Sequence, residues 1–289
     1  MIKKILYGIL SILLISILSG CDTNTNTVNK AYTSVYPTEY LLESLYGNNI
    51  EIHNIYPEGT NYNDYSLSSK QISDYSLGKL FVYNSTIDKE KNYAVKMLNN
   101  NKNLKIIDAS LGMTTNYDIA ESWLDPSNYL MMASNIKQGL KEYISEKYEI
   151  DDVINKNYDK LKQDISSLDA ELKEAANNSS QPVIVVSNDL FKFLEKYGFT
   201  VYSLQEGENL TNKTISEVKS LMANGTIKYI FLKDNEEESE LIKSLKDAYG
   251  VNVIRLNSLS SISAEDRNNN KDYLSIMEDN ISSIRLETN

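Results

Sequence analysis

The sequence is poor in the residues that most often build covalent staples and reactive sites. Its 289 residues include one cysteine, one histidine, one tryptophan and four prolines. A single cysteine excludes an internal disulfide, so the folded body must be stabilised by its core. No GxSxG, GxxxxGK[ST] or HExxH motif is present, and no histidine or cysteine lies where it would act as a base or nucleophile. Both observations make an enzyme the least favoured class of function.

Basic residues are also fewer than acidic ones. Residues 1–20 hold Lys3 and Lys4, and without them 27 basic side chains face 40 acidic ones, a formal charge of −13. The field of such a molecule repels polyanions. Nucleic acid and anionic lipid are therefore not expected as partners.

Only the N-terminus carries a long apolar run. Lys3 and Lys4 precede apolar residues 5–17, a segment too short to span a membrane and typical of a secretory signal. Small residues then lead directly to Cys21, which resembles a bacterial lipobox; the alternative is a buried free thiol. We predict a lipoprotein signal peptide at 1–20 and a lipid-bearing Cys21 in a polar tether at 21–29. The protein is then anchored by lipid on the extracytoplasmic face of the bacterial cell membrane.

Residues 151–177 predict one long amphipathic helix. At 1.5 Å per residue it would be about 35–40 Å long. Such a helix suits a linker between two lobes, although a helix within one large α/β domain has the same periodicity. Its apolar residues are spaced by three and four: Ile154, Tyr158, Leu161, Ile165, Leu168, Leu172 and Ala175.

Before this helix, short β-type runs alternate with helical patterns over residues 30–150. Pro37, Gly47 and Gly59 supply turns and helix ends between them. Asp125 and Pro126 predict the start of a helix, as a cap and a first-turn proline. We expect strands at 31–36, 50–56, 80–83 and 104–108, and helices at 38–46, 68–76 and 126–143.

The same alternation returns over residues 178–289. Four consecutive β-formers at 183–186 are typical of a central parallel strand. The two halves together predict an α/β fold of two doubly wound parallel-sheet lobes joined by a single long rigid helix, with ligands at the carboxyl ends of the strands. We expect strands at 183–186, 200–204, 227–232 and 251–256, and helices at 190–197, 213–222, 236–249 and 271–284.

The order and spacing of seven short sequence blocks are the most specific signal in the chain. They are TSVYP (33–37), IYPEGTNYNDYSLSSKQI (55–72), LFVYN (80–84), SWLDP (122–126), LDAELKEA (168–175), VVSNDLFKFLEKYG (185–198) and NSLS (257–260). In this order they resemble the cluster A-I substrate-binding proteins of ABC importers for zinc and manganese. The lipobox agrees, because such proteins in Gram-positive bacteria are lipoproteins.

The resemblance also implies where a metal would be held. The family binds its metal with three histidines and one acidic residue, at the ends of strands or in the loops that follow. The three histidine positions are occupied here by Asn63, Glu121 and Asn188, and the acidic position by Asn257. All four are altered, and the histidine-rich loop of the family is missing.

Three amides and one carboxylate remain at these positions. Zinc prefers imidazole and thiolate, so a zinc site of the usual kind is not expected. Oxygen donors suit a hard divalent cation weakly, or hydrogen-bond a small polar molecule. Asp64 and Asp189 follow two of the positions and are candidates for recruitment as ligands, although the resemblance implies a structural role for them. Tyr65 and Tyr36 are candidates for the walls of the cleft. The only histidine, His53, falls inside a predicted strand and not in a ligand loop.

Two functions from different classes follow. The first is a membrane-tethered solute-binding protein that works with an ABC permease and ATPase, is a monomer, and has an atypical or lost metal site. The alternative is a degenerate family member that acts as a surface adhesin or accessory partner without a solute of its own.

Overall fold

The computed structural model describes residues 29–114, 121–143, 148–207 and 210–288. The predicted signal peptide and most of the tether, including Cys21, lie outside the described residues. Within the described ranges no helix has the length and apolar character needed to cross a membrane.

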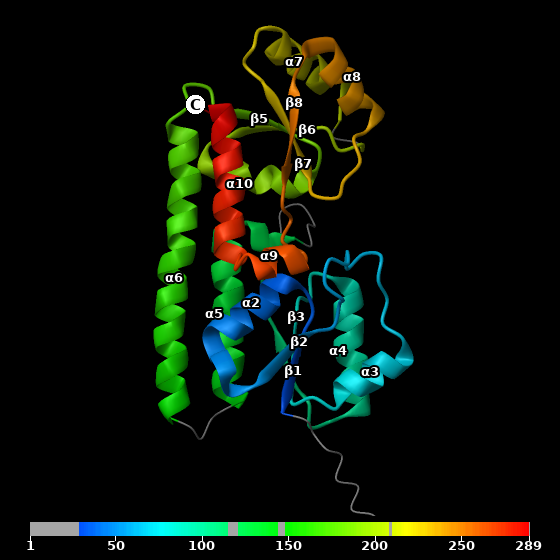
Figure 1. Cartoon of the computed structure of the whole chain (residues 1–289), viewed down its shortest axis with the longest axis vertical. Helices are drawn as coiled ribbons and strands as arrows, with labels where there is room; N and C mark the ends of the chain where they lie inside the picture. Colours follow the sequence, from blue (N-terminus) through cyan, green and yellow to red (C-terminus); the bar gives the residue numbers. More distant parts are fainter. Residues whose placement is uncertain (1–28, 115–120, 144–147, 208–209, 289) are drawn as a thin grey trace, which may run out of the picture.

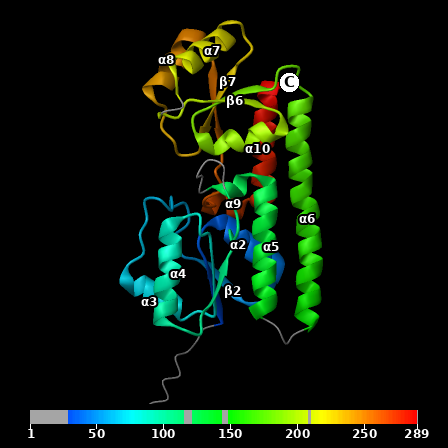
Figure 2. The same cartoon turned by 180° about the vertical axis from the view of Figure 1, so that it is seen from behind.

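The N-terminal lobe is built on a parallel sheet of four strands in the order β2-β1-β3-β4. Helices α2 and α5 lie on one side of this sheet and α3 and α4 on the other (Figures 1 and 2). In chain order the elements are β1 (Lys30–Thr33), α2 (Tyr36–Tyr46), η2 (Gly47–Asn49), β2 (Glu51–Asn54), α3 (Ser69–Ser76), β3 (Leu80–Tyr83), α4 (Asp88–Asn100), β4 (Lys105–Asp108), η3 (Ser122–Leu124) and α5 (Pro126–Tyr143).

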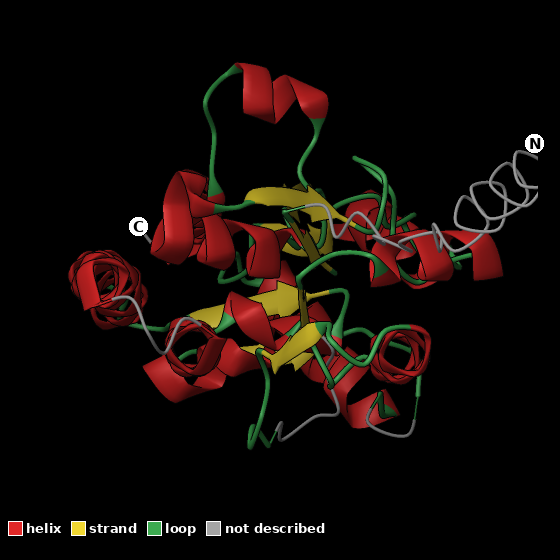
Figure 3. Ribbon diagram, turned by 90° about the horizontal axis from the view of Figure 1, so that it is seen from below, coloured by secondary structure: helices red, strands yellow, loops and turns green. Residues whose placement is uncertain are grey.

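The C-terminal lobe repeats the strand order as β6-β5-β7-β8, again with all pairs parallel. Viewed from below, the strands lie at the centre of the molecule with helices outside them (Figure 3). The elements are β5 (Val183–Val186), η4 (Asp189–Tyr197), β6 (Thr200–Ser203), α7 (Asn212–Ala223), β7 (Tyr229–Lys233), α8 (Glu240–Tyr249), β8 (Asn252–Leu256), α9 (Ala264–Asn268) and α10 (Tyr273–Thr288).

A single continuous helix, α6 (Tyr148–Asn177), runs beside both lobes (Figure 1). It contacts α2 and α5 of the first lobe, and α10 and η4 of the second. Its predicted stripe is buried at Ile154, Leu161, Ile165, Leu168, Leu172 and Ala175. These residues belong to a hydrophobic core that extends into both lobes, while a second cluster lies within the C-terminal lobe. Helix α6 therefore packs into a core that the two lobes share.

The main errors of the sequence-based prediction concern element ends and two helices. The first strand stops at Thr33, and Tyr36 begins α2 instead of ending the strand, because Pro37 fits the first turn of a helix. Residues 190–197 form part of a 3-10 helix and not an α-helix. The helix expected from 236 begins at Glu240, after Ser239 accepts a hydrogen bond from the amide of Ile242. Helices α4 and α9 were not expected.

Each sheet has one switch point, where the strands on either side of the first strand are reached by connections that run in opposite directions. In the second sheet this point lies between β5 and β7, and in the first between β1 and β3. Ligands of open parallel sheets bind outside the carboxyl ends of strands at such points. The loops that follow these strands are therefore where a site is expected.

Candidate functional site

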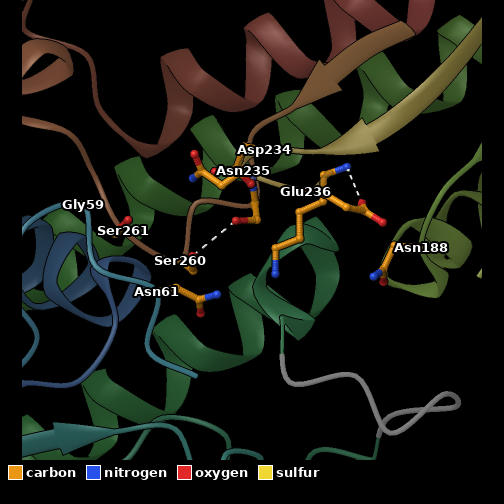
Figure 4. A pocket seen from close by; sticks show the side chains of 10 residues that line it. Gly59, Asn61, Asn188, Asp234, Asn235, Glu236, Ser260 and Ser261 are labelled. Atoms are coloured by element: carbon orange, nitrogen blue, oxygen red, sulfur yellow. Dashed lines mark hydrogen bonds between the residues drawn. The ribbon is translucent and has the colours of Figure 1, made fainter. Parts of the chain in front are cut away.

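A cavity of about 230 Å³ lies between the lobes, outside the carboxyl ends of β5 and β7. The first lobe contributes Gly59 and Asn61, and the second contributes the rest. Asn61 and Asn188 approach it from different sides (Figure 4). The lining residues are Gly59, Asn61, Asn188, Lys233, Asp234, Asn235, Glu236, Ser258, Ser260 and Ser261.

An ion pair joins the two lobes beside this cavity. Lys233, the last residue of β7, places its Nζ 2.8 Å from Oε1 of Glu121. The side chains are only 18% and 10% exposed, so this is a largely desolvated contact. Glu121 is one of the four positions that the sequence associates with a metal, and here its partner is an ammonium group of the same chain.

Tyr62 links Glu121 to a second such position, Asn63. The Tyr62 ring is almost fully buried, and its phenol lies close to the side chains of Glu121 and Asn63. Burial, followed by the charge of Glu121, raises the pKa of Tyr62 far above its ordinary value, so the phenol is neutral. Lys89 fixes this loop, since its Nζ donates to the carbonyls of Asn63 (3.3 Å) and Tyr65 (2.9 Å).

The two positions in the second lobe have turn-forming roles. The Asn188 Oδ1 accepts from the amide of Leu190 at 3.0 Å and caps η4. The Asn257 Oδ1 accepts from the amide of Leu259 at 2.7 Å, and its backbone is held on both sides by Asn280. Asn188 lines the cavity, whereas Asn257 precedes the lining residue Ser258.

The additional residues suggested by the sequence do not line this cavity. Asp64 is exposed, and the Asp189 carboxylate is 3.2 Å from Nζ of Lys192. The Tyr65 hydroxyl accepts from Gln71 at 2.7 Å. Tyr36 lies beneath the guanidinium of Arg267, 5.6 Å from the ring centre, beside a separate small pocket. His53 is in β2, with its Nε2 2.6 Å from Oε1 of Glu51.

Sequence reasoning missed the residues at the end of β7 and directly after it. Lys233, Asp234 and Glu236 line the cavity, although no family motif marks them. The available signal was topological: they follow the strand that flanks the switch point. Glu236 Oε2 accepts from the Ser187 hydroxyl at 2.5 Å and from the amide of Lys233 at 3.1 Å.

Backbone strain is concentrated in the same loops. Three described residues other than glycine have positive φ, and two of them, Asn235 (58°) and Leu259 (59°), flank the cavity. Asparagine tolerates this conformation, whereas for a buried leucine it costs free energy. Hydrogen bonds hold the second loop in place, because Trp123 Nε1 donates to the carbonyl of Ser258 at 2.8 Å.

Buried side chains pack across the two lobes beside these loops. Trp123 is fully buried, and the Tyr273 hydroxyl donates to its carbonyl at 2.6 Å. The rings of Tyr129 and Tyr273 stack with centres 3.7 Å apart. Lys196 pairs with Asp125 across the same interface.

Among the described residues, no group of three or more histidine, cysteine or acidic side chains is placed to hold a metal ion. The donors at the expected positions are amides and one carboxylate that already has an ammonium partner. That set does not fit zinc, which takes imidazole and thiolate.

The structure thus has two parallel-sheet α/β lobes with a polar cavity between them. The sequence profile of the family described as ZnuA, zinc-uptake complex component A, periplasmic, matches residues 32–286. The chain therefore belongs to this family, whose members are solute-binding proteins of ABC importers and not enzymes.

Known relatives are distant in sequence. The zinc-binding lipoprotein AdcA of Streptococcus pneumoniae is 22% identical over 282 residues, covering 89% of this chain and 55% of AdcA. The chain thus spans about half the length of that relative. The manganese ABC transporter substrate-binding lipoprotein PsaA of Streptococcus pneumoniae is 26% identical over 199 residues, 63% of each chain.

A solved structure supports the same architecture. The Zn(II)-bound ZnuA-like domain of Streptococcus pneumoniae AdcA aligns with a TM-score of 0.72 at 22% identity, covering 90% of this chain and 99% of that domain. The prediction of two parallel-sheet lobes beside a long helix is confirmed.

Proposed function

We propose that this protein is the lipid-anchored solute-binding component of an ABC importer, and that its family metal position is taken by the Lys233–Glu121 ion pair. The observation that carries the proposal is the 2.8 Å contact between these two side chains across the lobes. A buried ammonium there repels a second cation and occupies the carboxylate that would hold it. The solute is then something other than zinc or manganese.

The remaining features of the proposal follow from the sequence and the relatives. Cys21 carries the lipid, residues 1–20 are removed, and residues 30–150 and 178–289 form lobes joined by 151–177. An ABC permease and ATPase receive the solute from a monomeric protein on the extracytoplasmic face of the membrane. Two relatives are named lipoproteins, one of them a component of a manganese ABC transporter.

The cavity favours solute binding over an adhesin or accessory protein without a solute. A protein that only displays a surface has no need for a polar cavity of about 230 Å³ at the switch point of a sheet.

Elemental analysis and calorimetric zinc titration of the purified protein test the metal assignment. We expect no stoichiometric metal after purification, and zinc affinity several orders of magnitude below that of a three-histidine site. Nanomolar binding of one zinc per chain would overturn the proposal.

Membrane fractionation of the Cys21→Ala variant tests the anchor. We expect an unprocessed or released form, since the lipid attachment atom is gone. A lipid-free variant that stays tightly in the membrane fraction would show that another segment anchors the chain.

A further inference from the structure

We infer that the cavity between the lobes takes a small polar solute that carries a protonated amine together with oxygen acceptors. This inference rests on the proposed function and names the class of solute that the same site would bind. Its basis is the arrangement of donors and acceptors around the cavity, and not the size of the cavity alone.

Two carboxylates in the cavity lining are each held by hydrogen bonds through only one of their oxygen atoms. Asp234 accepts from the amide of Ser258 through Oδ1 at 2.9 Å. Glu236 uses Oε2 for the Ser187 hydroxyl and the Lys233 amide. Within the described part of the chain, Oδ2 of Asp234 and Oε1 of Glu236 form no hydrogen bond. Ionised oxygens of this kind form their strongest hydrogen bonds with a charged donor such as an ammonium group.

The cations near these carboxylates are engaged elsewhere. Lys233 points its Nζ to Glu121 at 2.8 Å. Arg255 donates to the backbone carbonyls of Lys233 and Glu236, not to a carboxylate. With Lys233 paired to Glu121, the lining keeps the negative charges of Asp234 and Glu236, so an anionic solute without an amine is disfavoured.

Two amides offer donors to the same cavity. Asn61 Oδ1 already accepts from the amide of Asn63 at 2.9 Å, and Asn188 Oδ1 accepts from that of Leu190 at 3.0 Å. Each side-chain amide has one oxygen and one NH₂ group, so the NH₂ groups remain for a solute. These NH₂ groups can donate to oxygen acceptors of a solute, such as its hydroxyl, carbonyl or carboxylate groups. Hydroxyls of Ser258 and Ser260, 3.2 Å apart, add groups that both donate and accept.

A bare metal ion fits this site poorly. A volume of about 230 Å³ exceeds what one coordinated ion needs, and it is close to the lower end of small-molecule pockets, roughly 300–1,000 Å³. An amino acid or an amino sugar has suitable size and chemistry.

Matched probe pairs test the role of the amine. L-serine would be compared with glycerate, and glucosamine with glucose, because each pair exchanges an amine for a hydroxyl. Calorimetry on the full protein should show roughly tenfold or tighter binding for at least one amine over its matched alcohol. Equal binding within both pairs, or binding of neither amine, overturns the inference.

Charge-removing variants supply the second measurement. Asp234→Asn with Glu236→Gln should abolish the preference for the amine, while Glu237→Gln, an exposed neighbour outside the lining, should retain it. Mass spectrometry of small molecules released on denaturing the native protein should yield an amine that is absent from the double variant. If the solute released from the native protein is neutral, the inference of an amine is wrong and the proposed function still stands. One zinc or manganese ion per chain would overturn both.

Discussion

The two lobes place a serine and a glutamate at equivalent positions, after the first and third strands of each sheet, in two different environments. In the first lobe the amide of Ser34, directly after β1, donates to Val82 of β3 at 3.1 Å. Glu90 Oε2 accepts from the amide of Asn84 after β3 at 3.0 Å.

The second lobe repeats the two backbone contacts. It differs in the serine hydroxyl, because Ser187 donates to Glu236 whereas the Ser34 hydroxyl forms no hydrogen bond with any described residue. The amide of Ser187, directly after β5, donates to Phe231 of β7 at 2.8 Å. Glu236 Oε2 accepts from the amide of Lys233 at the end of β7 and from the Ser187 hydroxyl. Each switch point thus holds a carboxyl that binds the amide where the third strand of its sheet ends.

Burial separates the two lobes. Glu90 is fully buried, and burial raises its pKa from 4.5 to about 8, against the opposing effects of Ser34 and the Asn84 amide. Glu236 is partly exposed and lines the cavity. The first switch point is closed by packing and contributes stability, whereas the second is open and available to a solute.

The largest expected effect concerns the helix that the lobes share. Leu161 of α6 is 4% exposed, so Leu161→Ala should lower the free energy of unfolding by about 2–5 kcal/mol. Because the core around Leu161 extends into both lobes, denaturant titration should show a single shifted transition. Gln163→Ala, on the exposed face, is the control. Two transitions with only one of them shifted would mean that the lobes unfold independently.

Removal of the buried carboxyl should cost less. Glu90→Ala removes the buried carboxyl and its hydrogen bond with the amide of Asn84, and loss of such a buried hydrogen bond costs about 1–3 kcal/mol. Lys91→Ala, at an exposed neighbour, should change the free energy of unfolding by less than about 0.5 kcal/mol. If both variants are equally stable by urea titration, the first switch point is not held by Glu90.

The raised pKa of Glu90 predicts a pH dependence. Between pH 4.5 and about 8 the folded chain keeps a proton on Glu90 that the unfolded chain has lost. Stability conferred by that protonated carboxyl therefore falls as pH rises through this window, by up to about 1.4 kcal/mol per pH unit. Glu90→Gln has no such proton. The free energy of unfolding of this variant should therefore rise, relative to that of the unaltered protein, as pH rises. Parallel profiles from pH 5 to 9 would contradict the assignment.

The smallest stability effect is expected at the matching residue of the second lobe. Glu236→Gln keeps an oxygen that can accept from the Lys233 amide and is partly exposed, so it should change the free energy of unfolding by less than about 1 kcal/mol. A loss as large as that of Glu90→Ala would erase the distinction between a packed and an open switch point.

Much of the architecture was predictable because hydrophobic periodicity reports burial directly. The stripe of α6 and strands such as Val183–Val186 were predicted from spacing and β-propensity alone. The helix start at Tyr36 was missed because β-branched and aromatic residues favour a strand, while Pro37 and the capping geometry favour a helix. Local propensity cannot rank these two effects.

The site was less predictable. Four positions were selected through the family resemblance. Asn188 lines the interlobe cavity and Glu121 forms the ion pair beside it, whereas Asn63 and Asn257 are not lining residues. Lys233 was not selected, because its partner Glu121 is 112 residues away in sequence and only the fold brings the two together. Long-range ion pairs leave no periodic signal in a single sequence.

The most direct test of the central claim is zinc calorimetry on two variants that differ only at residue 233. Both carry Asn63→His, Glu121→His, Asn188→His and Asn257→Asp, which restore the ligand types of the family, and one also carries Lys233→Met. If the ammonium of Lys233 takes the place of the metal, tight binding of one zinc per chain should require Lys233→Met, because a retained ammonium repels the ion. Equal zinc affinity with and without Lys233 would contradict that claim, and failure of both variants to bind would show that the four positions do not converge.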